Sequence, residues 1–281
     1  MFEAGLLKGK RILVTGGGSG LGAAMGRRFA ELGADLVICG RRRENLEQTA
    51  ATLQQDTGTR VTIFACDIRD ASAVETMMDA IWRDGAIDVL VNNAAATFIA
   101  QTERMSARAA DAILGPTLHG ALYCTIAAGK RWIDAGTRGV VLSILSTSTL
   151  TGRAFTVPSA MAKSGLLAMT RSLAVEWGPK GIRTVAIAPG PFPTAGATAR
   201  LHPGGRAADG PASRNPLGRV GEHQELADLA SFLVSDRAGY INGEMVSIDG
   251  GAHLRTSGAE DLLSWTDAQW DAHRQSLRTK N

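Results

Sequence analysis

The feature that most constrains the fold of this chain is a cluster of glycines at residues 15–22, which read TGGGSGLG. It joins an apolar run at residues 10–15, typical of a buried strand, to a helical apolar pattern at residues 21–32. Glycine permits positive φ and lets a pyrophosphate approach the backbone at the start of a helix. A tight turn without ligand is the alternative. The strand–loop–helix order favours a dinucleotide site with contacts from Gly16, Gly18, Ser19, Gly20, Leu21 and Gly22.

Strand and helix patterns alternate along the rest of the chain. Repeated β-α-β units predict one parallel sheet covered on both faces. We expect an α/β, doubly wound Rossmann-type fold with a seven-stranded parallel sheet, as a single domain over residues 1–281. The further strands are predicted at residues 35–39, 60–66, 87–91, 138–145, 182–188 and 244–248, and the further helices at residues 44–55, 71–83, 106–135, 158–178 and 222–235.

Three segments interrupt this regular pattern. Pro116 is expected to kink the long helix at residues 106–135. Residues 190–221 are rich in Pro, Gly, Ala and Arg and predict a long loop, with a mobile substrate lid at about residues 192–220. The tail at about residues 252–281, which carries two tryptophans, is expected to pack on the body or on a neighbouring subunit.

The composition excludes several classes of protein. A hydrophobic content of 44% and a charged content of 20% over 281 residues are typical of a globular chain with a sizeable core. The net charge of +3, without a dominant basic block, makes nucleic acid a poor partner. No apolar run of about 18 residues predicts a membrane span. Reduced core thiols are expected at Cys39, Cys66 and Cys124, which fits a cytoplasmic location, and no metal cluster is visible.

The end of the second predicted strand indicates which cofactor binds. An NAD site needs a carboxylate there for the ribose 2′-OH, whereas this chain reads Cys39-Gly40-Arg41-Arg42-Arg43. A guanidinium grips a 2′-phosphate that a carboxylate would repel. The sequence therefore predicts NADP(H), with Arg41 as the main contact to the 2′-phosphate and Arg42 as a second contact. The alternative is a solvated basic start to a helix.

Other predicted cofactor contacts follow later strands, because open α/β sheets bind ligands at the carboxyl ends of their strands. After the third strand, Asp67 and Ile68 would lie against the adenine. After the fourth strand, Asn93, Ala94 and Ala95 would form a wall of the cofactor site. After the sixth strand, Pro189, Gly190 and Phe192 would meet the nicotinamide.

The segment Ser159-Ala160-Met161-Ala162-Lys163 resembles the active-site helix of short-chain dehydrogenases/reductases, which usually reads Tyr-x-x-x-Lys. Here serine replaces the tyrosine. Ser159 and Lys163 share a helix face because they are four residues apart. The resemblance implies that Lys163 also holds the nicotinamide ribose and that Ser146, 13 positions before Ser159, is the catalytic serine. A surface lysine and ordinary loop hydroxyls are the alternatives.

The missing tyrosine changes the chemistry that is expected. The only tyrosines, Tyr123 and Tyr240, lie far from Lys163 in sequence. Ketone reduction needs a proton on oxygen, and losing a positioned acid costs roughly 10²–10⁴ in rate. Reduction of a conjugated thioester instead needs donors aimed at the thioester oxygen, each worth roughly 10²–10³. The later proton goes to carbon and can come from water.

A closer resemblance is to the 2,4-dienoyl-CoA reductases, and it covers nearly the whole chain. These short-chain reductases also carry Ser-x-x-x-Lys. The resemblance implies NADPH-dependent reduction of a 2,4-dienoyl-CoA to an enoyl-CoA in unsaturated fatty acid metabolism (β-oxidation), by a homotetramer that contacts through the two long helices. It is carried by Phe155–Lys163, Ala174–Gly178, Pro189–Pro191, Asn92–Ala95, Thr102–Arg104 and Trp270-Asp271.

Two positions depart from the pattern of the mitochondrial-type members. Their upstream tyrosine falls on Ser148, and their asparagine in the long helix falls on His119; both family residues donate to the thioester oxygen. We hypothesise that His119 and a serine hydroxyl supply these contacts, because imidazole donates through N–H. The alternative is a helix histidine packed at an interface.

Two other functions stay open on the sequence. One is a short-chain reductase of another activated substrate, such as a carbonyl, a 3-oxoacyl thioester or a quinone. The other is a catalytically impaired NADP(H)-binding sensor or subunit, which the missing tyrosine and the changes at Ser148 and His119 keep open. Lys163 and Ser146 argue against the impaired form.

Overall fold

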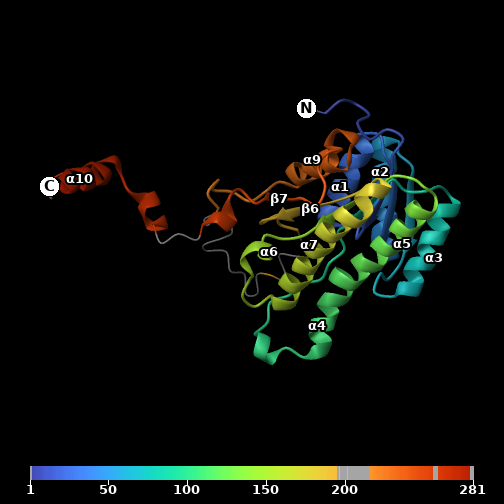
Figure 1. Cartoon of the computed structure of the whole chain (residues 1–281), viewed down its shortest axis with the longest axis horizontal. Helices are drawn as coiled ribbons and strands as arrows, with labels where there is room; N and C mark the ends of the chain where they lie inside the picture. Colours follow the sequence, from blue (N-terminus) through green and yellow to red (C-terminus); the bar gives the residue numbers. More distant parts are fainter. Residues whose placement is uncertain (1, 195, 197–200, 202–214, 256–258, 279–281) are drawn as a thin grey trace.

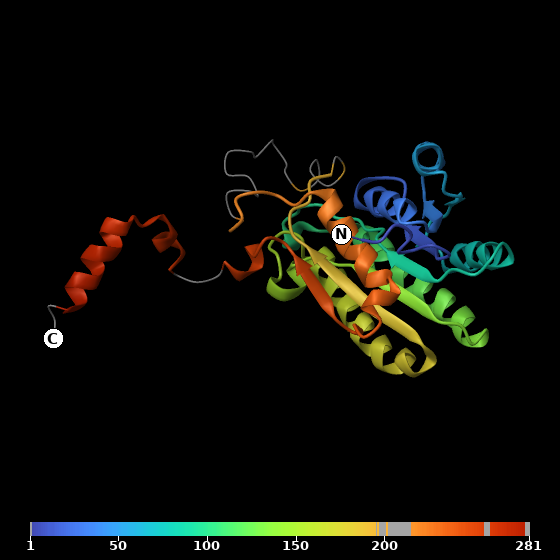
Figure 2. The same cartoon turned by 90° about the horizontal axis from the view of Figure 1, so that it is seen from above.

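The computed structural model describes residues 2–194, 196, 201, 215–255 and 259–278. Seven parallel strands form one sheet in the order β3-β2-β1-β4-β5-β6-β7, which confirms the predicted doubly wound fold (Figures 1 and 2). The chain order reverses between β1 and β4, where doubly wound sheets bind nucleotides. The strands are β1 (Arg11–Thr15), β2 (Asp35–Gly40), β3 (Val61–Ala65), β4 (Val89–Asn92), β5 (Gly139–Ile144), β6 (Ile182–Pro189) and β7 (Met245–Ile248).

Helices cover both faces of the sheet, because its strands bury apolar side chains on both sides. On one face the core packs under α1 (Gly20–Glu31), α2 (Arg43–Thr57) and α9 (His223–Val234). On the other face it packs under α3 (Ala71–Arg83) and α5 (Gly120–Asp134), with α7 (Val157–Trp177) alongside (Figure 1). None of the helices among the described residues is long and apolar enough to cross a membrane.

The strand register gathers the polar strand ends at one edge of the sheet. Val14 pairs with Val91, Asn92 with Ser143, and Pro189 with Ile248. The segments that follow β1, β4, β5, β6 and β7 therefore leave the sheet side by side. This edge carries most of the residues that the sequence singled out.

The long helix predicted at residues 106–135 is two α-helices joined by a π-helical turn. Helix α4 (Ala107–Leu114) leads into the turn at Gly115–His119, and α5 follows. Pro116 lies at the first positions of this turn, where it lacks the N–H that an α-helix would use. The predicted kink is therefore a π turn, and it places His119 at its last position.

Several short elements escaped the sequence patterns. Helix α6 (Ser148–Thr151) follows β5, and its four residues are too few to show a period. Short 3-10 turns, likewise without a period, occupy Thr102–Arg104, Gly178–Lys180, Asp236–Ala238, Ala252–Leu254 and Glu260–Ser264.

The predicted lid and tail have different outcomes. Most of the predicted lid lies outside the described residues. In the tail, α10 (Asp267–Arg278) lies apart from the body in both views (Figures 1 and 2). Its packing on the body is therefore absent from this structure, and packing on a neighbouring subunit stays a prediction. Trp265 and Trp270 pack on each other, with ring centroids 4.8 Å apart.

Candidate active site

The glycine loop is shaped by close packing against the segment after β4. Gly16 has φ +67°, and its N–H donates to the Cys39 carbonyl at 2.8 Å. At Gly22 a Cβ atom would lie 2.6 Å from the Asn93 Nδ2 and would also overlap the Gly16 carbonyl oxygen. No larger residue fits at Gly22 without moving this loop. The glycines therefore bring the start of α1 close to the switch point of the sheet.

The first turn of α1 has no side-chain cap from its N-cap residue. Ser19 is the N-cap, yet its side chain makes no capping hydrogen bond, and the first turn contains no acidic residue. The backbone N–H groups at this end therefore remain without the side-chain partner that usually satisfies them. Together with the glycine loop, this geometry fits the pyrophosphate of a dinucleotide.

The wall after β4 is fastened to the glycine loop through Thr15. The Thr15 hydroxyl accepts hydrogen bonds from the backbone N–H groups of Asn93 and Ala94, both at 3.0 Å, and donates to the Val91 carbonyl at 3.2 Å. The Asn93 carboxamide donates to the Thr15 carbonyl at 2.9 Å. Asn93 thus supports the wall itself, while its predicted contact with the cofactor stays a prediction, as does that of Ala95, which is exposed.

A basic pocket of about 300 Å³ lies beyond the ends of β2 and β3, lined by Arg41, Ala65, Cys66 and Asp67. Arg69, which the sequence analysis missed, grips Asp67 through two guanidinium nitrogens at 3.0 and 2.5 Å. These hydrogen bonds hold the pKa of the Asp67 carboxyl below its ordinary value. The two arginines therefore offset the carboxylate in this pocket.

The other two predicted residues near this pocket differ in exposure. Arg42 is exposed at the N-cap of α2, so its guanidinium is available to a ligand. Ile68 is 5% exposed and packs where a Cβ of Gly120 would otherwise lie. Ile68 therefore shapes the floor beside the pocket from within the core.

Lys163 lies on α7 with its side chain turned inward, and the residue is 7% exposed. Its Nζ donates to the Ile144 carbonyl at the end of β5, at 2.5 Å. Burial lowers the pKa of the Lys163 amine from 10.5 to about 8. No carboxylate within the described ranges pairs with this buried ammonium, which therefore attracts an anionic or hydroxyl-rich ligand. Ser159 is half-buried one turn earlier on the same helix.

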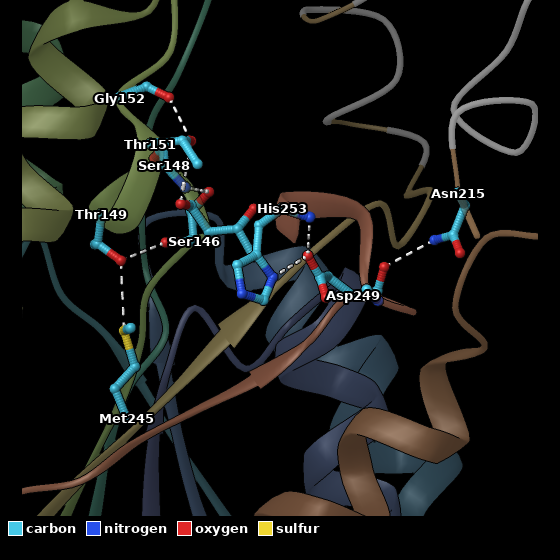
Figure 3. Close-up of polar contacts among 11 residues, drawn as sticks. Ser146, Ser148, Thr149, Thr151, Gly152, Asn215, Met245, Asp249 and His253 are labelled. Carbon is cyan, nitrogen blue, oxygen red and sulfur yellow. Dashed lines mark hydrogen bonds and ion pairs between the residues drawn. The ribbon is translucent and has the colours of Figure 1, made fainter. Parts of the chain in front are cut away.

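The serines after β5 form a small polar turn. The Ser148 backbone N–H donates to the Ser146 Oγ at 3.3 Å, and the Thr149 hydroxyl donates to the Ser146 carbonyl at 2.8 Å (Figure 3). Ser148 is buried at the start of α6. These bonds fix the Ser146 hydroxyl while leaving its own proton free to be donated.

His119 is exposed at the end of the π turn, with its ring centroid 6.4 Å from that of Tyr123. Within the described part of the chain, no hydrogen bond joins His119 to Ser146, Ser148 or Ser159. His119 and the serine hydroxyls are therefore not in contact with each other. The hypothesis that both donate to one thioester oxygen requires that the substrate lies between them.

The loop after β6 packs on the end of β7. The Gly190 N–H donates to the Ile248 carbonyl at 2.9 Å, and a Cβ at Gly190 would lie 2.5 Å from that of Asp249. Pro189 accepts a hydrogen bond of 3.4 Å from the Thr147 N–H, which joins this loop to the serine turn. Phe192 is 9% exposed. The predicted nicotinamide wall thus lies between the serine turn and β7.

Sequence analysis missed a carboxylate–imidazole pair beside this wall. Asp249 Oδ2 accepts from the Nδ1 of His253 at 2.8 Å, and Asn215 donates to the Asp249 carbonyl at 2.8 Å (Figure 3). The available signal was the polar residue that directly follows β7, at the sheet edge where ligands bind. The partner four residues later was hidden because the intervening turn has no periodic pattern.

The buried charge of Lys163 leads to a stability prediction for the cofactor-free protein. Its folded-state pKa of about 8 lies below the ordinary 10.5, so the unfolded chain binds the proton more tightly. The cost of burying the charge is fully present below pH 8 and disappears as the pH rises to 10.5. Lys163→Met should therefore raise the free energy of unfolding at pH 7, by at most about 3 kcal/mol. The lost bond to Ile144 offsets about 1 kcal/mol of this gain.

Urea unfolding at pH 7 to 10.5 measures this effect. The advantage of Lys163→Met should shrink across that pH range, while Lys130→Met, at an exposed position on α5, should show no such trend. A Lys163→Met protein that is less stable than the parent at pH 7, by a margin independent of pH, would contradict the assignment of a desolvated charge.

Comparisons with known proteins agree with this geometry. Residues 16–253 match the family model described as enoyl-(acyl carrier protein) reductase. A probable 2,4-dienoyl-CoA reductase [(2E)-enoyl-CoA-producing] of Bacillus subtilis is 42% identical over 247 residues, which are 87% of this chain and 97% of that protein. A probable 2,4-dienoyl-CoA reductase 3 [(3E)-enoyl-CoA-producing] of Caenorhabditis elegans is 41% identical over 277 residues, 96% of this chain and 90% of that protein.

A solved structure gives the same answer for the fold. The crystal structure of a short chain dehydrogenase from Bacillus anthracis superposes with a TM-score of 0.81 at 39% identity, covering 89% of this chain and 99% of that one. The fold and the glycine loop imply a nicotinamide cofactor. The chain belongs to the short-chain dehydrogenase/reductase family of oxidoreductases.

Proposed function

We propose that this chain is an NADPH-dependent reductase of 2,4-dienoyl thioesters of coenzyme A. The observation that carries the proposal is a buried Lys163 with a serine, Ser159, one turn before it in place of the usual phenol. Relatives named 2,4-dienoyl-CoA reductase at about 40% identity support it. Their names specify different products, a (2E)-enoyl-CoA in one and a (3E)-enoyl-CoA in the other, so the position of the remaining double bond is part of what the assay must measure.

The basic pocket supports NADPH rather than NADH. Arg41 lines it at the end of β2, and no carboxylate stands there for a ribose 2′-OH. Asp67 is the acidic residue in its lining, and Arg69 neutralises that charge at contact distance. A 2′-phosphate in this pocket would therefore meet guanidinium groups without an unpaired carboxylate beside it.

The chain supplies binding and charge stabilisation for the reaction. The reduced nicotinamide, when bound, supplies the hydride. Lys163 would hold the ribose hydroxyls from inside the pocket, and its desolvated charge favours the anionic dienolate that forms on the substrate. Ser146, with its proton free, and His119 and Ser148 are the proposed donors toward the thioester oxygen. Ser159 leaves room on α7 where a phenol would otherwise stand.

We propose the assembly from the family resemblance and the location from the cysteines. Exposed apolar side chains occur on both long helices, with Ile126 on α5 and Met161 and Val175 on α7. Their exposure supports the homotetramer that the resemblance implies, with these helices at the subunit contacts. A cytoplasmic location is proposed on the three buried free thiols.

Replacement of Arg41 tests the choice of cofactor. Arg41→Glu removes a charge-assisted contact and adds repulsion. A hydrogen bond to a charged group is worth roughly 1.5–3 kcal/mol, so the Kd for NADPH should rise about 10- to 100-fold. The Kd for NADH should change less than threefold. Nicotinamide fluorescence measures both. Arg43→Gln is the matched control, because Arg43 pairs with Glu47 on the outside of α2. Equal losses for both cofactors would contradict a 2′-phosphate role for Arg41.

The activity itself is tested by following NADPH absorbance with a 2,4-dienoyl-CoA, and by chromatography of the enoyl-CoA product. The proposal expects NADPH consumption that depends on the dienoyl-CoA. Consumption only with carbonyl substrates would make the chain a different short-chain reductase. Tight NADPH binding without consumption by any of these substrates would identify the impaired sensor or subunit.

The role of His119 has its own kinetic test. His119→Ala should lower kcat with the dienoyl-CoA by about 10²-fold, the value of one donor to a developing oxyanion. The Kd for NADPH should stay unchanged. Tyr123→Phe, which keeps the neighbouring ring, is the control and should retain the parent rate. A His119→Ala enzyme as fast as the parent would show that the role assigned to His119 is wrong.

A further inference from the structure

The pair Asp249–His253 lies where the polypeptide leaves β7 and turns back across the sheet edge. The Asp249 side chain is 3% exposed and that of His253 is 20% exposed. Asp249 Oδ1 accepts from the Gly251 N–H at 3.0 Å, and Oδ2 accepts from the His253 backbone N–H at 2.8 Å. These two bonds close the turn through the backbone alone. The third bond, from the imidazole Nδ1 at 2.8 Å, is therefore additional to what the turn needs.

This third bond fixes the orientation of the imidazole. Because Nδ1 donates to the carboxylate, the proton on that nitrogen is held and Nε2 points away from Asp249. Nε2 of His253 has no hydrogen-bond partner within the described part of the chain. A buried carboxylate behind a partly exposed imidazole is the arrangement that holds a histidine ready for proton transfer.

The imidazole faces the predicted reacting centre. Figure 3 shows the His253 ring on the side of Asp249 that faces the segment carrying Ser146 and Ser148. Backbone contacts give the same placement, because Gly190 abuts Asp249 and Pro189 accepts a hydrogen bond from Thr147. The pair therefore borders the loop that we assign to the nicotinamide wall.

We propose that His253, positioned by Asp249, is the proton donor that completes reduction of the dienoyl thioester. The inference rests on the proposed function and adds a residue to it. Without a phenol near Lys163, one proton still has to reach carbon, and a positioned donor transfers it faster than water does. The Asp249 carboxylate holds Nδ1, so Nε2 is the ring nitrogen turned toward the reacting centre and is the atom that we assign to proton transfer.

The step balances in atoms and electrons. The hydride adds to C5 of the dienoyl thioester, and the C4=C5 electron pair moves through the conjugated system to the thioester oxygen. The dienolate then returns that pair to form a new C–H bond at C2 or C4, using the proton from His253 Nε2. The thioester carbonyl reforms, the imidazole becomes neutral, and solvent restores its proton.

His253→Ala is the variant that tests this role. Loss of a general acid should lower kcat about 10²-fold or more, because water replaces the positioned donor. The Kd for NADPH, measured by fluorescence, should stay within twofold of the parent, since the backbone bonds to Asp249 remain. Added imidazole should restore a substantial part of the rate. His273→Ala, at an exposed histidine on α10, is the control and should behave as the parent.

Deuterium incorporated into the product from D2O tests the same role independently of the reaction rate. In D2O the parent should place one deuterium at C2 or C4 with a single configuration, because the donor lies on one face of the dienolate. His253→Ala should give a mixture of configurations from protonation by water. A parent that binds NADPH but consumes none with the dienoyl-CoA contradicts the proposed function and the inference together. An active parent whose His253→Ala variant keeps its rate and its labelling pattern, or loses rate without rescue by imidazole, overturns the inference alone.

Discussion

The structure depends on one clasp at the switch point of the sheet, where Thr15 ends β1 and Asn93 follows β4. The Thr15 hydroxyl serves two backbone N–H groups and one carbonyl of the neighbouring strand, while the Asn93 side chain returns to the Thr15 carbonyl. Buried backbone groups at strand ends must find such partners. Because these hydrogen bonds join the two strands on either side of the reversal, they hold the glycine loop against the wall after β4.

The electrostatics of the site follow from its burial. Lys163 is desolvated and, among the residues that the structure describes, has only the Ile144 carbonyl as a hydrogen-bond partner, so its charge is poorly compensated there. Asp67 is offset by Arg69 at the other end of the predicted cofactor path. The Asp249 carboxylate accepts hydrogen bonds from its own turn and from His253. These pairings leave positive charge at Lys163 and near Arg41.

The sequence allowed the sheet and the glycine loop to be predicted, because both leave a pattern in the residues themselves. Buried parallel strands are short apolar runs, and Gly17 and Gly22 have no room for a Cβ atom in the folded loop. The turns after β5 and β7 left no such pattern. Helix α6 is one turn long, and the bond between Asp249 and His253 depends on a turn geometry that no period reveals. The pairing of Arg69 with Asp67 was missed because the Arg69 side chain folds back onto a residue two positions earlier, and no sequence pattern indicates this.

The π turn at Gly115–His119 has a consequence for the helix that contains it. Successive residues of an α-helix are about 100° apart around the axis, and a π turn accommodates one residue more than an α turn would. The outward faces of α4 and α5 are therefore out of phase by about that angle. The segment before the turn and the segment after it can present different surfaces while remaining one continuous rod.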